Sequence, residues 1–133
     1  MTTSRPALLG IRHVALFMTD LEAAERFWVD VMGYEVEWRP DADNVYLRGG
    51  ADNLALHRAA PGAASAPGML DHIGLAVRAP EDVDAWAAHL TAKRVALKAQ
   101  PKTHRDGSRS LYFHAPEGLL VQIIHHPPMT EVQ

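Results

Sequence analysis

The chain has 133 residues, of which 47% are apolar and 22% charged, a composition typical of a folded globular protein that excludes a disordered chain. It contains no cysteine, which excludes disulfide scaffolds, thiolate zinc sites, iron–sulfur clusters and cysteine nucleophiles. The net charge of −3 argues against nucleic acid or an anionic membrane as a partner, because both attract basic surfaces. With no membrane-spanning stretch and no signal-like N-terminus, we expect one cytoplasmic domain over residues 1–133.

The first half of the chain is predicted to hold one helix among short strands. A strand-like run covers 10–17. The helix is predicted to begin at Thr19, where Glu22 follows at capping-box spacing, and to end at Gly33. Runs of β-branched and aromatic residues then predict strands over 34–39, 45–48 and 54–58.

The second half is predicted to repeat this order. A segment of small residues, Pro and Gly at 59–69 is typical of a linker. After it come a strand-like run over 70–77 and a helix that begins at Ala79 with proline and acidic residues in its first turn. Further strands are predicted over 95–99, 110–114 and 119–125.

Two histidines fall at matching places in this internal repeat. His13 and His72 each lie near the start of the first strand of a β-α-β-β-β module, 59 residues apart. The modules cover 10–58 and 70–126. Alternation along a strand puts small neighbours on the same face as each histidine, which leaves room for a ligand. These neighbours are Ala15 in the first module, and Gly74 and Ala76 in the second.

Three large side chains are predicted to lie in the core. Trp28, Met32 and Trp86 fit the apolar stripes of the two helices, so we interpret them as buried packing residues and not as part of a cofactor site. His89 is interpreted as a helix-surface residue. His125 and His126 are interpreted as the fraying end of the last strand.

Four stretches in this order resemble a known superfamily. They are His13-Val-Ala-Leu-Phe with Asp20-Leu21 and Phe27-Trp28, then Met32-Gly33-Tyr34, then Asp71-His72-Ile-Gly-Leu-Ala-Val77, and Ser110-Leu-Tyr-Phe-His-Ala-Pro-Glu-Gly118 running into Leu120-Val-Gln-Ile123. Over 10–126 the chain resembles the vicinal oxygen chelate superfamily of glyoxalases, extradiol dioxygenases and bleomycin-resistance proteins. The resemblance implies an α+β fold in which two tandem βαβββ modules form a cup-shaped mixed sheet with helices outside. It also implies a metal and a small ligand in the cup, and a homodimer.

The resemblance also implies a set of metal ligands. It places His13 and His72 at the imidazole positions, and Gln122 where a carboxylate usually binds the metal. Ala55 stands where glyoxalase-type members have another glutamate. His57, on the same strand face as Ala55, either leans back to complete a set of His13, His57, His72 and Gln122 or faces solvent at the sheet edge. Such ligands suit Fe, Mn, Ni, Zn or Co without distinguishing among them.

Other polar residues are candidates for substrate contacts. His57 and Tyr112 are candidate catalytic bases. Tyr46 and Tyr112 fall on corresponding strands, Arg48 shares a face with Tyr46, and Ser110 and His114 share a face with Tyr112. The polar segment 101–109 is predicted to be a loop that covers a binding cleft, with His104, Arg105 and Arg109 as candidates.

Two functions remain open on these residues. The first is a metal-dependent enzyme of the glyoxalase or dioxygenase type that chelates vicinal oxygens of a small molecule, acting as a lyase or a dioxygenase. Strict glyoxalase I activity is not expected, because Ala55 and Gln122 replace the carboxylates that move its proton. The second is a ligand-sequestering protein of the bleomycin-resistance type, without a catalytic metal.

Overall fold

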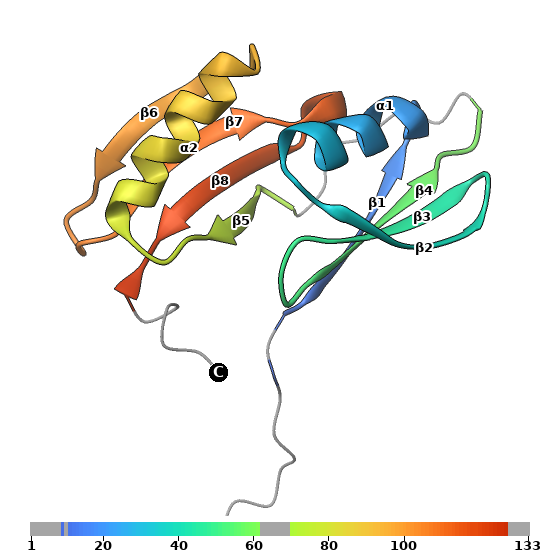
Figure 1. The fold of residues 1–133 in the computed structure, drawn as a ribbon, viewed down its shortest axis with the longest axis horizontal. Helices are drawn as coiled ribbons and strands as arrows, with labels where there is room; N and C mark the ends of the chain where they lie inside the picture. The colour runs from blue at the N-terminus through green and yellow to red at the C-terminus, as the bar shows by residue number, and fades with distance from the viewer. Residues whose placement is uncertain (1–8, 10, 62–69, 128–133) are drawn as a thin grey trace, which may run out of the picture. The chain divides into compact units, whose positions relative to one another are not determined.

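A computed structural model describes residues 9, 11–61 and 70–127 (Figure 1). The chain divides into two compact units, Met1–Ala63 and Ala64–Gln133, which we call module one and module two. The predicted linker 59–69 lies outside the described residues from 62 onwards, and so does Gly10 at the predicted start of the first strand. That both modules form one domain stays a prediction, and each module is described by itself.

Module one is a four-stranded mixed sheet with one helical segment. Its elements are β1 (His13–Met18), α1 (Leu21–Arg26), a π-helical turn (Phe27–Val31), β2 (Glu35–Asp41), β3 (Asn44–Arg48) and β4 (Asn53–Arg58). The strand order is β1-β4-β3-β2, with β1 parallel to β4 and the other neighbours antiparallel. The predicted β-α-β-β-β order is confirmed here.

Module two has the same topology. Its elements are β5 (Ile73–Ala76), α2 (Pro80–Ala92), β6 (Leu97–Thr103), β7 (Arg109–His114), a short 3-10 turn (Pro116–Gly118) and β8 (Leu120–His125). The order β5-β8-β7-β6, again with the first pair parallel, repeats that of module one. The internal repeat and the α+β class predicted from the sequence are therefore confirmed.

The helix of each module packs on one face of its own sheet. In module one α1 packs against β4, and in module two α2 packs against β6, β7 and β8 (Figure 1). The fully buried side chains between helix and sheet are Leu21, Trp28, Val45, Leu47 and Leu56 in module one, and Val83, Leu90, Leu111, Phe113, Val121 and Ile123 in module two. Burial of each such side chain contributes about 1.5–3 kcal/mol. Strand alternation turns the intervening residues to the other side, which we call the helix-free face.

The N-cap of the first helix lies one residue later than predicted. Asp20, and not Thr19, is the N-cap: its side-chain Oδ1 accepts a hydrogen bond from the backbone N–H of Ala23 at 3.0 Å. Glu22 lies inside the first turn of α1. Gly33, with φ of +80°, ends the helical segment as predicted.

Both edge strands run further than predicted, and each continues through a proline. Strand β2 extends through Pro40 to Asp41, and β6 extends through Pro101 to Thr103. Each proline lies where the register with the neighbouring strand shifts. Proline has no N–H to donate, so it is tolerated on an edge strand or at a bulge. The predicted loop 101–109 therefore shrinks to 104–108.

The predicted core residues separate into two groups. Trp28 is fully buried and Met32 is buried, as predicted. Trp86 is only half-buried and meets the ring of His89 edge-on at 5.1 Å between centroids, so its assignment to the core was wrong.

Candidate functional site

The helix-free face of module one holds three rows of side chains set by the strand register. From one end, the rows are His13 with Asn53, Ala15 with Ala55 and Tyr46, and Phe17 with His57 and Asn44. His13 and His57 therefore lie four residues apart along the paired strands, a separation of about 13 Å. The register does not bring the two histidines of module one together.

His13 is oriented by a chain of two hydrogen bonds. Its Nδ1 lies 2.7 Å from Oδ1 of Asn53, and the Asn53 amide nitrogen donates to Oε1 of Glu37 at 2.7 Å. A carboxylate can only accept, so Asn53 turns its own oxygen to the imidazole and Nδ1 carries the proton. In the neutral ring the lone pair is then on Nε2, the atom available to a metal.

His57 has the same arrangement with different residues. Its Nδ1 lies 2.6 Å from Oδ1 of Asn44, whose amide nitrogen donates to Oδ1 of Asp41 at 2.8 Å. The backbone N–H of Asp43 donates to the same carboxylate at 2.8 Å. This backbone bond, together with that from Asn44, holds the pKa of Asp41 below its usual value. Asp41 is therefore an ionised acceptor, and His57 also presents Nε2.

An aromatic row runs across the same face. The ring of Phe17 lies 6.0 Å from that of His57, His57 meets Tyr46 edge-on at 5.9 Å, and Tyr46 stacks on Trp38 at 5.3 Å. Phe17 is 76% exposed and Trp38 is 60% exposed. We call these four residues the aromatic row. The exposed ring of Trp38 stacked on Tyr46, with Phe17 at the other end of the row, presents an aromatic surface that suits a planar ligand.

In module two His72 lies one residue before β5 and not within it. Its Nδ1 lies 2.7 Å from Oδ2 of Asp71, so this ring too has its Nδ1 occupied by an acceptor. The His72 ring meets the ring of Tyr112 edge-on, with centroids 5.4 Å apart. The structure therefore brings together two of the predicted site residues.

Gln122 lies between β5 and Tyr112 on the same face. The register pairs it with Gly74 on one side and with Tyr112 on the other. A Cβ built on Gly74 would lie 3.5 Å from Oε1 of Gln122, so the amide oxygen rests over the bare backbone of β5. His72, Gln122 and Tyr112 thus form one group, which we call the module-two group.

The two modules correspond position by position. By register, the equivalent pairs are His13 with His72, Ala15 with Gly74, Ala55 with Gln122, and Tyr46 with Tyr112. The predicted correspondence of the two tyrosines is confirmed. Module two has an amide oxygen where module one has only the methyl group of Ala55.

Arg109 and His104, two candidates from the predicted loop 101–109, each contact another side chain of module two. The Arg109 guanidinium pairs with Asp84 at 2.6 Å and donates to Oγ1 of Thr103 at 3.0 Å. This pairing holds the pKa of Asp84 below its usual value. His104 lies at the end of β6, where its Nε2 is 2.9 Å from Oγ of Ser110. Arg109 is thus a structural residue that ties β7 to α2.

The C-terminal end of β8 does not fray as predicted. His125, the last residue of the strand, pairs with Arg109 of β7. His125 and His126 are both half-buried, and within the described residues their Nδ1 atoms are buried without a hydrogen-bond partner. Pairing in the sheet holds this end of the strand in place.

Residues that orient the histidines were missed at the sequence level. Asn53, Asn44 and Asp71 each accept from an imidazole Nδ1. Asn53 lies two residues before Ala55, so strand alternation could have placed it on the histidine face, and Asp71 directly precedes His72 in the sequence. Only the contact of Asn44 with His57 depends on strand pairing that the sequence does not reveal. Among residues 9, 11–61 and 70–127, no three His, Asp or Glu side chains gather closely enough to hold a metal ion.

The family model described as the glyoxalase/bleomycin resistance protein/dioxygenase superfamily matches residues 10–123. The chain belongs to this superfamily. The sequence resemblance, which rested on four stretches in order and on the internal repeat, is therefore confirmed. Of the described helices, none has the length and apolar character needed to cross a membrane.

Two curated relatives of this superfamily member are dioxygenases by name. The chain is 28% identical over 121 residues to a 2,2',3-trihydroxybiphenyl dioxygenase of Sphingomonas paucimobilis, covering 87% of this chain and 41% of that protein. It is 29% identical over 118 residues to a manganese-dependent 2,3-dihydroxybiphenyl 1,2-dioxygenase of Geobacillus genomosp. 3, covering 85% and 35%. The superfamily member thus spans about two fifths of the length of these relatives.

A solved structure has a similar fold. The lactoylglutathione lyase of Agrobacterium tumefaciens aligns with a TM-score of 0.68 and 25% identity, over 87% of this chain and 92% of that one. Relatives of this superfamily member thus include proteins named for two different reactions.

Proposed function

We propose that this protein is a metal-dependent enzyme of the dioxygenase type that acts on a small molecule with two neighbouring oxygen atoms. The proposed metal ligands are His13 from module one, and His72 and Gln122 from module two. The observation that carries the proposal is the state of the two imidazoles: each has its Nδ1 bound to an oxygen acceptor, which leaves Nε2 to a metal. Histidine ligands of metals are held in this way.

The donor set fits a divalent transition metal. Two imidazoles and an amide oxygen suit Fe, Mn, Ni, Zn or Co, and one curated relative is manganese-dependent by name. When bound, such an ion would hold two oxygens of the substrate and stabilise negative charge that develops on them. Gln122 is neutral, so we expect weaker metal binding than a carboxylate would give.

His57 is left out of the proposed ligand set, because about 13 Å of strand separates it from His13. We propose it instead as a base that faces the substrate, since its Nε2 carries the lone pair. Tyr112 is the second candidate, because its ring touches that of His72 beside Gln122.

The aromatic row supports an aromatic diol as the substrate class. Stacked and exposed rings favour a planar ligand, and both curated relatives are named for hydroxylated biphenyls. The proton-moving chemistry of a glyoxalase is less well supported, because Ala55 is buried and carries no carboxylate, and Gln122 is an amide. A dioxygenase places both atoms of O₂ in the product, so no external reductant is required.

Metal binding and oxygen consumption test the proposal together. Protein prepared without a chelator or histidine tag is titrated with Mn²⁺ and Fe²⁺ by calorimetry, and O₂ uptake is followed with catechol and 2,3-dihydroxybiphenyl. We expect one ion per chain, and a loss of more than about 100-fold in metal affinity for His13→Ala and His72→Ala. His89→Ala, a histidine of α2, is the control and keeps wild-type affinity. Equal metal affinity in all three variants would end the proposal.

A sequestering protein is the second candidate, and the two missing carboxylates favour it. At the equivalent positions Ala55 and Gln122, neither module has an anionic ligand. On this alternative, catechol binds with the same affinity in metal-free and metal-loaded protein, and no O₂ is consumed with any of the metals. Metal-dependent catechol binding would contradict it.

The homodimer implied by the resemblance stays a prediction. Sedimentation velocity of the purified chain tests it, with a species of twice the chain mass as the expected result.

A further inference from the structure

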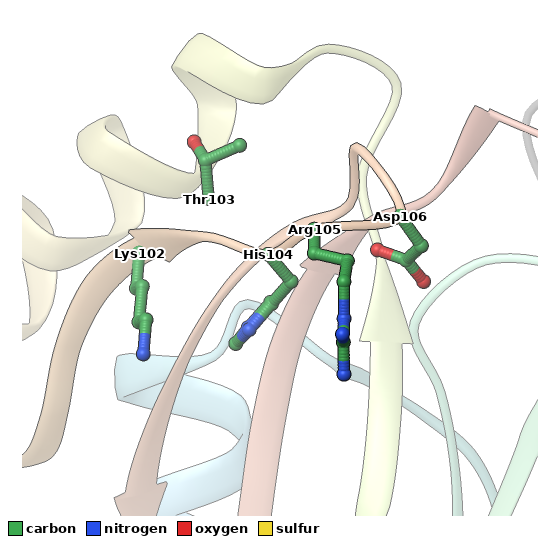
Figure 2. Close-up of a pocket in the computed structure, with 5 residues that line it drawn as sticks. All are labelled: Lys102, Thr103, His104, Arg105 and Asp106. Atoms are coloured by element: carbon green, nitrogen blue, oxygen red, sulfur yellow. The ribbon is translucent and has the colours of Figure 1, made fainter.

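The β6–β7 loop of module two lines a cavity with a positive wall. The cavity has a volume of about 680 Å³ and is lined by Lys102, Thr103, His104, Arg105 and Asp106. Figure 2 shows the side chains of Lys102, His104 and Arg105 extending in the same direction, while Thr103 lies on the opposite side of the strand. Three nitrogen-bearing side chains therefore face one space.

The two cations of this cavity are not neutralised by the protein. Arg39, Arg58 and Arg109 each pair with a carboxylate. By contrast, Lys102 and Arg105 form no ion pair within the part of the chain that the structure describes. Basic side chains that converge without a protein partner attract an anion.

Asp106 does not cancel this charge. Its Oδ1 accepts from both the backbone N–H of Ser108 at 2.9 Å and the Ser108 hydroxyl at 2.7 Å. These bonds hold the pKa of Asp106 below its usual value, so the group is an anion at neutral pH that closes the turn of the loop. Against the two cations Lys102 and Arg105, this single anion leaves the cavity with a net positive charge.

The cavity continues the helix-free face that carries the module-two group. In the register of β6 and β7, Lys102 lies opposite Ser110, and the Ser110 hydroxyl is hydrogen-bonded to the His104 ring. Ser110 lies two residues along β7 from Tyr112 and shares its face, a distance of about 7 Å. Lys102 and His104 of the cavity and the Tyr112 ring that contacts His72 therefore lie on the same sheet, close enough for one small molecule to reach both.

We propose that Lys102, His104 and Arg105 bind a carboxylate of the substrate. The two neighbouring oxygens of the same substrate then lie at the module-two group, on the same face of the sheet. The second half of this inference rests on the proposed function; the carboxylate site itself does not. The proposed substrate class is then an aromatic vicinal diol that carries a carboxylate on a side chain, two or three bonds from the ring.

The carboxylate site is tested first in metal-free protein. 3-Phenylpropanoate, an anion without vicinal oxygens, is titrated into the ¹⁵N-labelled full chain. We expect amide signals of 102–108 to shift, and the apparent affinity to fall about tenfold in Lys102→Gln/Arg105→Gln. Lys93→Gln/Lys98→Gln removes the same charge from module two outside the cavity and keeps the affinity. Unshifted loop signals, or equal affinities in the two double variants, would overturn the site.

The metal-loaded protein tests the link to the substrate. Binding of 3-(3,4-dihydroxyphenyl)propanoate is compared with that of its neutral primary amide by calorimetry. We expect the acid to bind about three- to tenfold more tightly, and the ratio to fall to about one in Lys102→Gln/Arg105→Gln. Arg105→Lys keeps the charge and most of the preference.

The failures of the two proposals are distinguishable. In His72→Ala both compounds lose affinity if the proposed metal function is right, while the preference for the acid persists. A preference for the acid with no effect of His72→Ala supports the carboxylate site and contradicts the metal function. Equal binding of acid and amide by the wild type contradicts the carboxylate site alone.

Discussion

His13 donates its Nδ1–H to Oδ1 of Asn53 at 2.7 Å, across the parallel pair β1 and β4. Asn53 is itself held by the carboxylate of Glu37 at 2.7 Å. The tautomer of the imidazole is therefore decided by a residue 40 positions away in the chain. Module two reaches the same tautomer with the adjacent Asp71.

Removal of this acceptor should weaken metal binding without unfolding the protein. In Asn53→Ala the ring of His13 loses its orientation, so we expect Mn²⁺ affinity to fall about 10- to 100-fold by calorimetry. Asn44→Ala removes the equivalent acceptor of His57, which lies outside the proposed ligand set, and should leave the affinity unchanged. Equal losses in both variants would place His57 among the ligands.

Restoring a carboxylate at the module-two group should strengthen metal binding. Gln122→Glu keeps the length of the side chain over Gly74 and replaces a neutral oxygen with an anionic one. We expect a gain of at least about tenfold in Mn²⁺ affinity. Gln100→Glu adds the same charge at an exposed position of β6 and should have no effect. If the affinity does not rise in Gln122→Glu, Gln122 is not a ligand.

The aromatic row gives a test of the substrate class. Trp38→Ala removes an exposed ring that stacks on Tyr46, so we expect catechol to bind about 3- to 10-fold more weakly. Val36→Ala truncates a second exposed apolar side chain of β2 and serves as the control. Fluorescence titration measures both, and an unchanged catechol affinity in Trp38→Ala would remove the aromatic row from the site.

Gly49 is predicted to be intolerant of any side chain. A Cβ at this position would overlap the ring of Tyr34, which is buried, packs edge-on to Trp28 at 5.2 Å and donates its hydroxyl to Asp52 at 2.7 Å. The ring has no room to move, so Gly49→Ala should lower the free energy of unfolding by about 1–3 kcal/mol in urea. Nothing lies near a Cβ on Gly50, and Gly50→Ala should cost far less.

We expect Tyr34 to make the free energy of unfolding fall at alkaline pH. Burial, and then the bond to Asp52, raise the pKa of Tyr34 above its ordinary value of 10.0. The folded state keeps this proton when the unfolded chain has lost it, so the stabilisation is present below pH 10 and declines as the pH rises above it. The slope is at most about 1.4 kcal/mol per pH unit.

Urea unfolding at pH 8 and pH 10.5 measures this effect. The wild type should lose more stability between the two pH values than Tyr34→Phe, which has no phenol proton to lose. A loss of the same size in both proteins would assign the alkaline sensitivity to other groups.

Amino-acid sequence alone determined the repeat, the α+β class and the two modules. Helical apolar stripes, the stop at Gly33 and the matched strands around His13 and His72 are local signals, because they depend on residues a few positions apart. The same signals placed Trp28 in the core and put Gln122 on the last strand. The helical pattern wrongly placed Trp86 in the core, because burial depends on which elements pack against a residue and not on its spacing along the helix.

Tertiary structure decided the contacts between distant segments. The separation of His57 from His13 follows from the parallel register of β1 and β4, and the extension of β6 through Pro101 follows from its edge position. The acceptors of His13 and His57, which are Asn53 and Asn44, also depend on which strands pair. Strand pairing joins segments that no local pattern links, and a shift of one residue in register would turn each of these side chains to the other face.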